Sequence, residues 1–548
     1  ILVAQSPLVR KNVPKEEDLF RPVDRTLIHA RGCTAVNLVV RAKELGKSIV
    51  LIQSDPDMDS FAADLIRGDP QHSLVCIGGN TSDESYLNAL SVISIAESEK
   101  VDSLHPGIGF LSEDPNFAYL VRQKGINFIG PPVASMETMG NKSNAINTTM
   151  AIDVPVVPGS HGIVDNSERA AEISEQIGYP VLLKAVHGGG GKGIQIVEKP
   201  EQLHRLFHQV SNEARAAFGN GDLYIEKFVT SLRHIEAQLL RDRFGNTKVI
   251  GIRDCSVQRN NQKIMEESGS VLLSKELNSA LRSYAAKIGD SVDYVGVGTV
   301  EFIHDLPNNA IYFMEMNTRL QVEHPVTEAV TGVNIVEKQF QISEGESIKD
   351  IKYREKGYAL EVRVNAEKLV IDAEGKVSFQ PTPGEVSKFF LPEQIGVRAI
   401  SMISEGKVVP PFYDSLILQI ISYGRNRKDS VKKMLSYLDG VIINGISTNI
   451  SLIKRILEDK VFLSGEYDTS YLDKFLERTD FDELAAEIEE ASGSIREAVN
   501  LEMLKIPGSN EFRVVSPSAG IFYRAPSPSE PEYVNEGDVV SSEDILCQ

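Results

Sequence analysis

The sequence predicts a multidomain protein of mixed α/β and α+β structure, and three observations support this class. The chain has 548 residues, 42% of them hydrophobic, which suffices for several buried cores. Residues 26–54 read as strand, turn, amphipathic helix and strand, the pattern of a βαβ unit. Residues 299–303 and 311–317 are rich in β-branched and aromatic types and flank a Pro-Asn-Asn turn, which predicts a β-hairpin.

Composition excludes several classes of function. The net charge is −20 without a basic block, which disfavours nucleic acid as a partner. There is no signal peptide and no apolar run that could span a bilayer, so no membrane partner is expected. The 4 cysteines lack CxxC spacing, which argues against a zinc site or a disulfide framework and for a reducing compartment, the cytoplasm.

The N-terminal part of the chain is expected to be structural. Because the first residue is Ile1, we expect the chain to belong to a longer polypeptide, and residues 1–24 read as a Pro-broken extension. The βαβ unit then opens an α/β domain over residues 25–138. Its first turn, at Arg31 and Gly32, lacks the GxGxxG pattern, so a dinucleotide site is not expected there.

A glycine-rich stretch predicts a phosphate-binding flap. The glycines at 188–191 and Gly193 lie between two predicted strands, so they form a hairpin and not a P-loop, which would open a helix. Glycine lets backbone N–H groups approach phosphates closely, while Lys184 and Lys192 supply positive charge. The alternative is a plain flexible turn, but four consecutive glycines exceed what a tight turn needs.

The predicted hairpin brings two carboxylates together. Closing it at the middle of its turn sets Glu301 opposite Glu315, with Cβ atoms about 4.5–5.5 Å apart. Strand alternation places Ile311, Phe313 and Asn317 on the same face as Glu315. Facing carboxylates repel unless a cation lies between them, which predicts a Mg²⁺ site; the alternative is a coincidental acid pair on a surface hairpin.

The segment after the hairpin completes a candidate reaction centre. Arg319, Gln321 and Glu323 alternate toward the same site, so an anion could be held and deprotonated there. Upstream, the strand at 222–229 ends near Glu226, which suits a nucleotide-base hinge. His234 alone is balanced between a structural residue and a ligand contact.

Several motifs resemble the biotin carboxylase component of biotin-dependent carboxylases. They are MGNK at 139–142, GYPVLLKA at 178–185, GGGGKG at 188–193, RDCSVQR at 253–259 and EMNTRLQVEHPVTE at 315–328. The resemblance covers roughly residues 24–474 and implies an ATP-grasp fold. It implies an N-terminal α/β domain at 25–138, an ATP-grasp domain at 139–349 with a flap at about 180–230, and a C-terminal biotin carboxylase domain at 350–478.

The same resemblance implies roles for individual residues. ATP would be held by Lys142, Lys184, Gly188, Gly189, Gly190, Gly191, Lys192, Gly193, Glu226, Lys227, Val229, His234 and Gln258. Mg²⁺ (or Mn²⁺) would be bound by Glu301, Glu315 and Asn317. Bicarbonate would be held by Lys263, Arg319, Gln321 and Val322, with Glu323 as the base and Arg363 stabilising the biotin enolate.

The sequence also departs from the family pattern. The usual ANRGEIA segment is here HARGCTA at 29–35, and the usual RRHQK is RNNQK, so that Asn261 replaces a histidine beside the nucleotide. Asparagine keeps hydrogen-bonding capacity but cannot become cationic. Activity remains the favoured interpretation because the residues implied to react are all present.

The C-terminal end predicts partners. An acidic, helical-period segment at 479–510 reads as a linker, and residues 511–548 resemble the first half of a biotin carboxyl carrier domain. In that family the biotin-bearing lysine would follow Gln548. We therefore expect biotin attached beyond this residue, a carboxyltransferase in the same or a partner chain, and a homo-oligomer. Ile395, which stands where an aromatic residue is frequent, weakens the last expectation.

Three functions are compatible with these patterns. The first is the biotin carboxylase of an acyl-CoA carboxylase, and the second is another ATP-grasp ligase that joins a carboxylate to an amine. The third is a non-catalytic arm that positions a biotinyl domain. The QVEHP segment favours the first.

Overall fold

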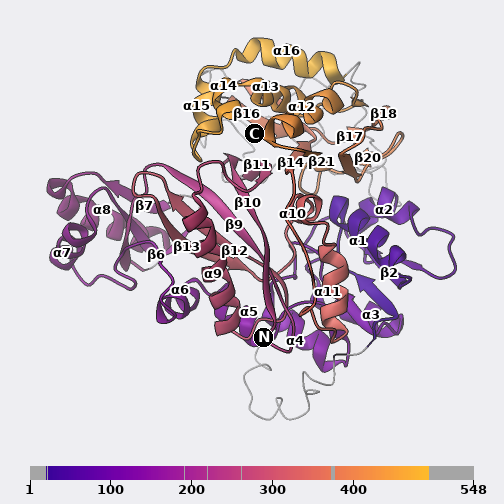
Figure 1. Cartoon of the computed structure of the whole chain (residues 1–548), viewed down its shortest axis with the longest axis horizontal. Coiled ribbons are helices and arrows are strands. Elements are labelled where there is room, and N and C mark those ends of the chain that lie inside the picture. The colour runs from indigo at the N-terminus through magenta and orange to yellow at the C-terminus, as the bar shows by residue number, and fades with distance from the viewer. Residues whose placement is uncertain are drawn as a thin grey trace, which may run out of the picture.

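The computed structural model describes residues 20, 22–189, 192–218, 220–260, 262–371 and 377–492. Asn261, most of the predicted extension and the whole predicted carrier segment 511–548 lie outside the described residues. None of the helices in the described part is long and apolar enough to cross a membrane. Figure 1 shows an N-terminal α/β region, a projecting flap and a large sheet capped by C-terminal helices.

A parallel sheet forms the N-terminal region. Strands β1 (Arg25–Ile28), β2 (Ser48–Gln53), β3 (Ser73–Cys76), β4 (Ser103–His105) and β5 (Asn127–Phe128) pair in the order β3-β2-β1-β4-β5. Helices α1 (Gly32–Glu44), α2 (Phe61–Asp64), α3 (Ala89–Ser98) and α4 (Pro115–Gln123) lie in the connections, as parallel pairing requires. The predicted βαβ unit is confirmed as β1, α1 and β2.

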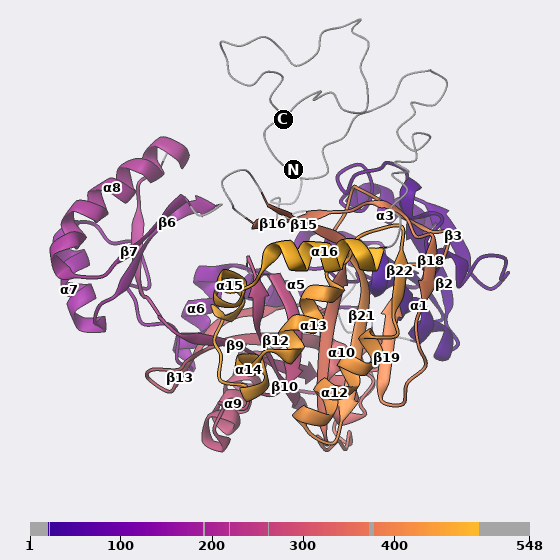
Figure 2. The same cartoon turned by 90° about the horizontal axis from the view of Figure 1, so that it is seen from above.

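The flap is a separate small unit. After α5 (Val133–Gly140) and α6 (Lys142–Ala151), strands β6 (Val181–Gly189), β7 (Lys192–Val197) and β8 (Leu223–Lys227) form an antiparallel sheet in the order β7-β6-β8. Helices α7 (Ser167–Ile177) and α8 (Pro200–Phe218) pack on this sheet and share a hydrophobic core of its own. Figures 1 and 2 both show the flap projecting from the body.

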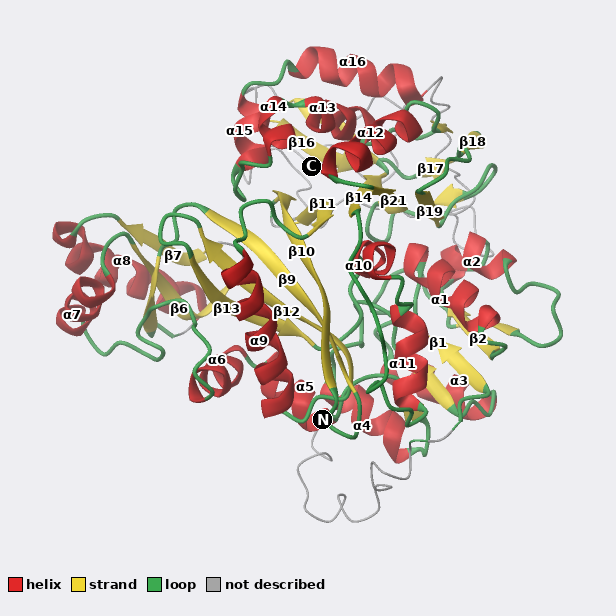
Figure 3. Cartoon of the chain, viewed as in Figure 1, coloured by secondary structure: helices red, strands yellow, loops and turns green. Residues whose placement is uncertain are grey.

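The large sheet carries the middle of the chain. Its strands are β9 (Leu232–Arg241), β10 (Thr247–Arg259), β11 (Gln262–Ser268), β12 (Gly296–Asp305), β13 (Ala310–Asn317), β14 (Tyr358–Asn365), β19 (Val397–Ser401) and β21 (Leu416–Gly424). They form an antiparallel eight-stranded sheet in the order β13-β12-β9-β10-β11-β14-β21-β19. Helix α9 (Lys275–Ser291) packs on β9 and β10 (Figure 3). The sheet thus runs without interruption from the central part of the chain into its C-terminal part.

Helices and short strands complete the C-terminal part. Helices α10 (His324–Thr331) and α11 (Ile335–Ser343) precede β14. Further elements are β15 (Glu367–Ile371), β16 (Val377–Pro381), β17 (Gly384–Glu385), β18 (Lys388–Phe390), β20 (Val408–Val409), β22 (Ile442–Asn444), α12 (Arg427–Leu438), α13 (Ile450–Glu458), α14 (Lys460–Ser464) and α15 (Tyr471–Glu477).

The last described helix is α16 (Phe481–Ser492), which begins the segment interpreted as a linker. Its residues Leu484 and Ile488 are buried in the main hydrophobic core. Glu487 accepts hydrogen bonds from Arg455 of α13 at 2.8 and 2.9 Å. This helix therefore packs as part of the C-terminal region, and the remainder of the segment lies outside the described residues.

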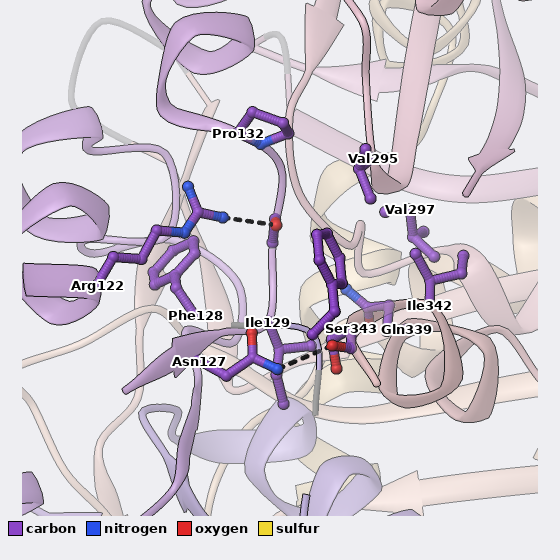
Figure 4. Close-up of a pocket in the computed structure, with 13 residues that line it drawn as sticks. Arg122, Asn127, Phe128, Ile129, Pro132, Val295, Val297, Gln339, Ile342 and Ser343 are labelled. Carbon is purple, nitrogen blue, oxygen red and sulfur yellow. Dashed lines mark hydrogen bonds between the residues drawn. The ribbon is translucent and has the colours of Figure 1, made fainter. Parts of the chain in front are cut away.

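A small cavity lies between the N-terminal region and the large sheet (Figure 4). It encloses about 30 Å³, room for about one water molecule. Asn127 donates a hydrogen bond to the carbonyl of Ser343 at 2.9 Å, and Arg122 donates one to the carbonyl of Pro131 at 2.9 Å. The first contact joins the N-terminal region to α11 (Ile335–Ser343), the second lies within the N-terminal region, and the cavity is too small to hold a nucleotide.

Candidate active site

A row of charged side chains crosses the large sheet. Glu315 on β13 pairs with Glu301 on β12, Glu301 pairs with Glu236 on β9, and Glu236 pairs with Arg253 on β10. Register partners point to the same face of a sheet, so these four side chains share one side. The predicted opposition of Glu301 and Glu315 is confirmed.

A β-bulge corrects the rest of the predicted alternation. Phe302 pairs with Phe313, but the next pair is Glu301 with Glu315, so Met314 is an extra residue on β13. The bulge places Phe313 and the isoleucine two residues before it on the opposite face from Glu315, where both are buried in the hydrophobic core. The prediction that these apolar residues share the glutamate face was therefore wrong.

Lys263 lies at the centre of the carboxylates. Its Nζ bonds to Glu236 and lies 2.8 Å from Oε1 of Glu323 and 3.3 Å from Oε1 of Glu301. The second oxygen of Glu236 accepts hydrogen bonds from Arg253 at 2.9 and 3.1 Å. Glu236 and Arg253 are fully buried, so each charge depends on the other for compensation.

Arg363 on β14 joins this cluster from the other side. Its Nε donates to Oε1 of Glu266 at 2.6 Å, and its Nη2 donates to Oε2 of Glu323 at 3.0 Å. Burial alone would raise the pKa of Glu323, but Lys263 and Arg363 hold that pKa below its ordinary value. Burial would also lower the pKa of Lys263, yet Glu236 and Glu323 raise it well above its ordinary value. Glu323 is thus an ionised carboxylate between two cations.

His234 lies beside two carboxylates. Its Nε2 lies 2.8 Å from Oε2 of Glu301 and 3.4 Å from Oε1 of Glu236. Burial disfavours the charged imidazole, but Glu301 and Glu236 raise its pKa to about 10. The other ring nitrogen, Nδ1, lies 3.0 Å from Nε2 of Gln258. The structure shows His234 in contact with carboxylates of the protein, and its contact with a ligand stays a prediction.

The polar segment after β13 wraps around Glu301. Asn317 and Gln321 each donate a side-chain N–H to Oε1 of Glu301 at 2.7 Å. Both are buried, with 9% and 3% of their surface exposed. Val322 contributes its backbone carbonyl, which accepts from Gln419 on β21 at 3.0 Å. The segment is thereby fixed against both halves of the sheet.

Arg319 points toward the N-terminal region. Its Nε donates to Oε2 of Glu113 at 2.8 Å, and its Nη2 donates to Oδ1 of Asn317 at 3.2 Å. The backbone N–H of Thr318 donates to the other oxygen of Glu113 at 2.9 Å. One carboxylate of the N-terminal region therefore holds both the backbone and the guanidinium of the polar segment.

The candidate nucleotide residues line the flap and its base. Lys184 on β6 forms an ion pair with Glu226 on β8. Lys227 donates to the backbone carbonyls of Gly178 and Tyr179 at 2.7 and 3.1 Å. Val229 lies in the β8–β9 connection, and Lys142 is the first residue of α6. Gly188 and Gly189 end β6, Lys192 and Gly193 begin β7, and Gly190 and Gly191 lie outside the described residues.

Glu315 fits a divalent cation. Its carboxylate makes no hydrogen bond or ion pair with another described residue, and partial burial together with the charge of Glu301 raises its pKa. A cation between two opposed carboxylates would relieve this repulsion, and oxygen ligands suit Mg²⁺. Asn317 supplies a neighbouring amide oxygen, which accepts from Arg319 in this structure. Ligand atoms of His234, Glu236 and Glu301 also lie within 4.8 Å of one another, as in a metal site. There, however, the ammonium group of Lys263 already contacts both carboxylates.

Sequence reasoning did not single out four residues of this site: Glu113, Glu236, Arg253 and Glu266. The alternation of charged and polar residues along β9 and β10 was a usable signal, since Glu236 lies two residues after His234 on the same face. No comparable signal marks Glu113, which comes from another region of the chain.

Three family models match the chain. The biotin carboxylase N-terminal domain matches residues 22–136, the ATP-binding domain of the carbamoyl-phosphate synthase L chain matches 141–351, and the biotin carboxylase C-terminal domain matches 361–474. Together they cover the regions that contribute Glu113, the charged row and Arg363.

Curated relatives and solved structures agree with these models. The chain is 40% identical to biotin carboxylase 1 of Bacillus subtilis over 455 residues, 83% of this chain and 99% of that protein. It is 40% identical to the 2-oxoglutarate carboxylase small subunit of Hydrogenobacter thermophilus, over 82% and 93% of the two chains. Biotin carboxylase from Campylobacter jejuni superposes with a TM-score of 0.74 at 38% identity, over 82% and 99% of the two chains. The chain belongs to the biotin carboxylase family, ATP-grasp ligases that carboxylate biotin with ATP.

Proposed function

We propose that the chain makes carboxyphosphate from ATP and bicarbonate, with Glu323 as the base, and then carboxylates biotin. The observation that carries this proposal is the ionised carboxylate of Glu323, only 2% exposed and held between Lys263 at 2.8 Å and Arg363 at 3.0 Å. A base must be unprotonated and able to reach its substrate, and both cations favour the unprotonated form. The same cations attract an anionic substrate.

The first step uses the polar segment around Glu323. Lys263, Arg319 and Gln321, together with the backbone at Val322, hold bicarbonate beside Glu323, which accepts its proton. The carbonate oxygen attacks the γ-phosphorus of ATP in line, the bond from this phosphorus to the bridging oxygen breaks, and ADP leaves with that electron pair. The product is carboxyphosphate. The short contacts between Lys263 and three carboxylates support this placement.

The second step uses Arg363. Carboxyphosphate breaks down to CO₂ and phosphate, the phosphate accepts the N1 proton of biotin, and N1 attacks CO₂. The negative charge that develops on the ureido oxygen of biotin is stabilised by the guanidinium of Arg363. Its position on a β-strand, fixed by Glu266 at 2.6 Å, supports a role that requires accurate placement.

Nucleotide and metal binding are assigned to neighbouring residues. Lys142, Lys184, His234 and Gln258 hold the nucleotide with the flap backbone, and Glu226, Lys227 and Val229 lie at its base. Glu301 and Glu315, with Asn317 beside them, would hold Mg²⁺, which when bound neutralises phosphate charge. The unpaired carboxylate of Glu315 supports this assignment.

The acceptor downstream is an acyl-CoA in this proposal. The resemblance of residues 511–548 to the thumb-bearing carrier domain of acetyl-CoA carboxylases supports it, although those residues lie outside the described part. Relatives include a 2-oxoglutarate carboxylase subunit and, among solved structures, the biotin carboxylase subunit of pyruvate carboxylase. Pyruvate and 2-oxoglutarate are therefore the competing acceptors.

One assay tests the first half-reaction. ATP hydrolysis is measured with Mg²⁺ and bicarbonate, with and without free biotin, and Glu323→Gln is the matched control that removes only the basic oxygen. Stimulation by biotin in the wild type and its loss in the variant support the proposal. Bicarbonate-independent amide synthesis would select the carboxylate–amine ligase, and absence of turnover would select the non-catalytic arm.

A second assay identifies the acceptor. The full-length polypeptide, biotinylated by a biotin ligase and supplied with its carboxyltransferase, is incubated with labelled bicarbonate and acetyl-CoA, propionyl-CoA, pyruvate or 2-oxoglutarate. Acid-stable label on an acyl-CoA supports the proposal. Label on pyruvate or 2-oxoglutarate alone, or biotin found on a lysine within residues 1–548, contradicts it.

A further inference from the structure

A second pair of glutamates faces across the large sheet. Glu266 on β11 is the register partner of Glu361 on β14, so their Cβ atoms lie about 4.5–5.5 Å apart on one face. Both residues are 0% exposed. Two buried carboxylates at this spacing cannot both remain ionised without a cation between them.

Their hydrogen bonds leave one oxygen of each without a partner. Oε1 of Glu266 accepts from Arg363, and Oε1 of Glu361 accepts from Gln419 at 2.7 Å. Oε2 of Glu266 and Oε2 of Glu361 are both buried and accept from no other described residue. Buried carboxylate oxygens rarely lack a partner, so a hydrogen that the heavy atoms do not reveal is the simplest completion.

The neighbouring carboxyl groups have cationic partners that Glu361 lacks. Glu266 and Glu323 pair with Arg363, and Glu236 pairs with Arg253 and Lys263. Among the described residues, no cation lies within ion-pair distance of Glu361. Glu361 is therefore the carboxyl group of this cluster that a proton has to neutralise.

We infer that Glu361 carries a proton at neutral pH and donates it to Oε2 of Glu266, so that the pair holds one negative charge that orients Arg363. Glu361 and Glu266 are then positioning residues, which act on the reaction only through the guanidinium. Their kinetic effect rests on the proposed role of Arg363, whereas the shared proton does not.

The titration behaviour of the pair agrees with this inference. Burial, and then the charge of Glu266, raise the pKa of Glu361 well above its ordinary value. Burial and the charge of Glu323 raise the pKa of Glu266 to about 7, while Arg363 and Lys263 oppose the rise. The thiol of Cys33 on α1 also faces Glu361 and is itself kept protonated, because burial raises its pKa to about 12.

Infrared spectroscopy tests the proton directly. The wild-type protein at neutral pH should show a carbonyl stretching band of a protonated carboxyl group that shifts in D₂O. Glu361→Gln should remove that band, while Glu385→Gln, which alters an exposed carboxylate on β17, should retain it. A wild-type spectrum without the band, or a band that survives in Glu361→Gln, would overturn the inference whatever the enzyme's activity.

Kinetics test the positioning role. Glutamine keeps an N–H that can donate to Glu266, so Glu361→Gln should retain biotin-dependent turnover. Methionine has a similar volume but no donor, so Glu361→Met should lower kcat/KM for biotin by roughly tenfold or more. Equal losses in both variants would contradict the donor role. If the band is present but neither variant changes turnover, the shared proton stands and the link to Arg363 fails.

Discussion

Two pairs of opposed glutamates lie on the same sheet, yet they are neutralised in different ways. In the first, Glu301 is buried and contacts Lys263 and His234, whereas Glu315 is exposed and has no cationic partner in the described chain. In the second, Glu266 and Glu361 are both fully buried. Register alone therefore does not decide what relieves the repulsion between paired carboxylates.

Solvent access explains the difference. A hydrated divalent ion can reach a pair with one exposed member, and oxygen ligands from both strands can then replace part of its water shell. A fully buried pair offers no such path, so a proton is the cation that fits. The first pair is thus suited to a metal that enters with the nucleotide, and the second to a fixed charge that positions Arg363.

The largest effect on catalysis should come from changing Glu323, the carboxylate between the two pairs. Glu323 contacts Lys263 on one side and Arg363 on the other. Glu323→Gln keeps the shape but removes the base, so we expect bicarbonate-dependent ATP hydrolysis to fall by about 10²- to 10⁴-fold. Steady-state rates and nucleotide binding measured by calorimetry check this. Loss of ATP binding in the variant would show that Glu323 is structural.

Removing Arg363, which the buried pair holds, should affect the biotin step more than nucleotide binding. Arg363→Ala removes the guanidinium that we propose stabilises the biotin enolate, so we expect biotin-dependent turnover to fall by about 10²- to 10³-fold. KM for MgATP should change little, because Arg363 contacts Glu266 and Glu323 and no residue assigned to the nucleotide. A rise in KM for MgATP as large as the loss in turnover would count against two separate sites.

Altering Glu315, the exposed member of the first pair, should affect metal binding. Glu315→Gln removes a charged ligand, so we expect the affinity for Mg²⁺ and MgATP to fall by roughly 10- to 100-fold. Titration of activity with Mg²⁺ at fixed ATP measures the change. Glu198→Gln, which alters an exposed carboxylate of the flap, is the control and should leave the titration unchanged.

Local sequence patterns were sufficient to predict only part of the arrangement of side chains in this site. The opposition of Glu301 and Glu315 was predicted from a hairpin with a regular register, whereas in the structure it also depends on a β-bulge. The bulge at Met314 was not visible, and it decides which apolar side chains are buried. Without the bulge, the register at the turn would set Glu301 opposite Met314 instead.

Contacts between distant strands could not be derived in the same way. Glu266 reaches Arg363 because β11 pairs with β14, and the two residues are 97 positions apart in the chain. Sheet order sets such partners, and alternation within one strand carries no information about it. The resemblance to biotin carboxylases indicated Arg363 and Glu323 but not Glu266, the other carboxylate that holds the guanidinium.

The smallest expected effect is on the pH dependence of stability, which the buried pair Glu266 and Glu361 should influence. Burial raises the pKa of Glu266 to about 7 from an ordinary value of 4.5, and raises the pKa of Glu361 well above that ordinary value. The folded state therefore binds a proton that the unfolded state has released. Its contribution to stability is fully present below about pH 4.5 and is lost as the pH rises through about 7 and beyond.

Glu361→Gln should flatten this dependence, because a glutamine needs no proton. His234, whose pKa is raised to about 10, gives stability that also declines at alkaline pH, so the comparison must be between variant and wild type at each pH. Between about pH 6 and 8.5 we expect the wild-type Tm to fall by about 1–4 °C more than that of the variant, as scanning calorimetry can measure. Parallel curves for the two proteins would show that Glu361 binds no proton on folding, and the buried pair would then need a cation, as we propose for Glu301 and Glu315.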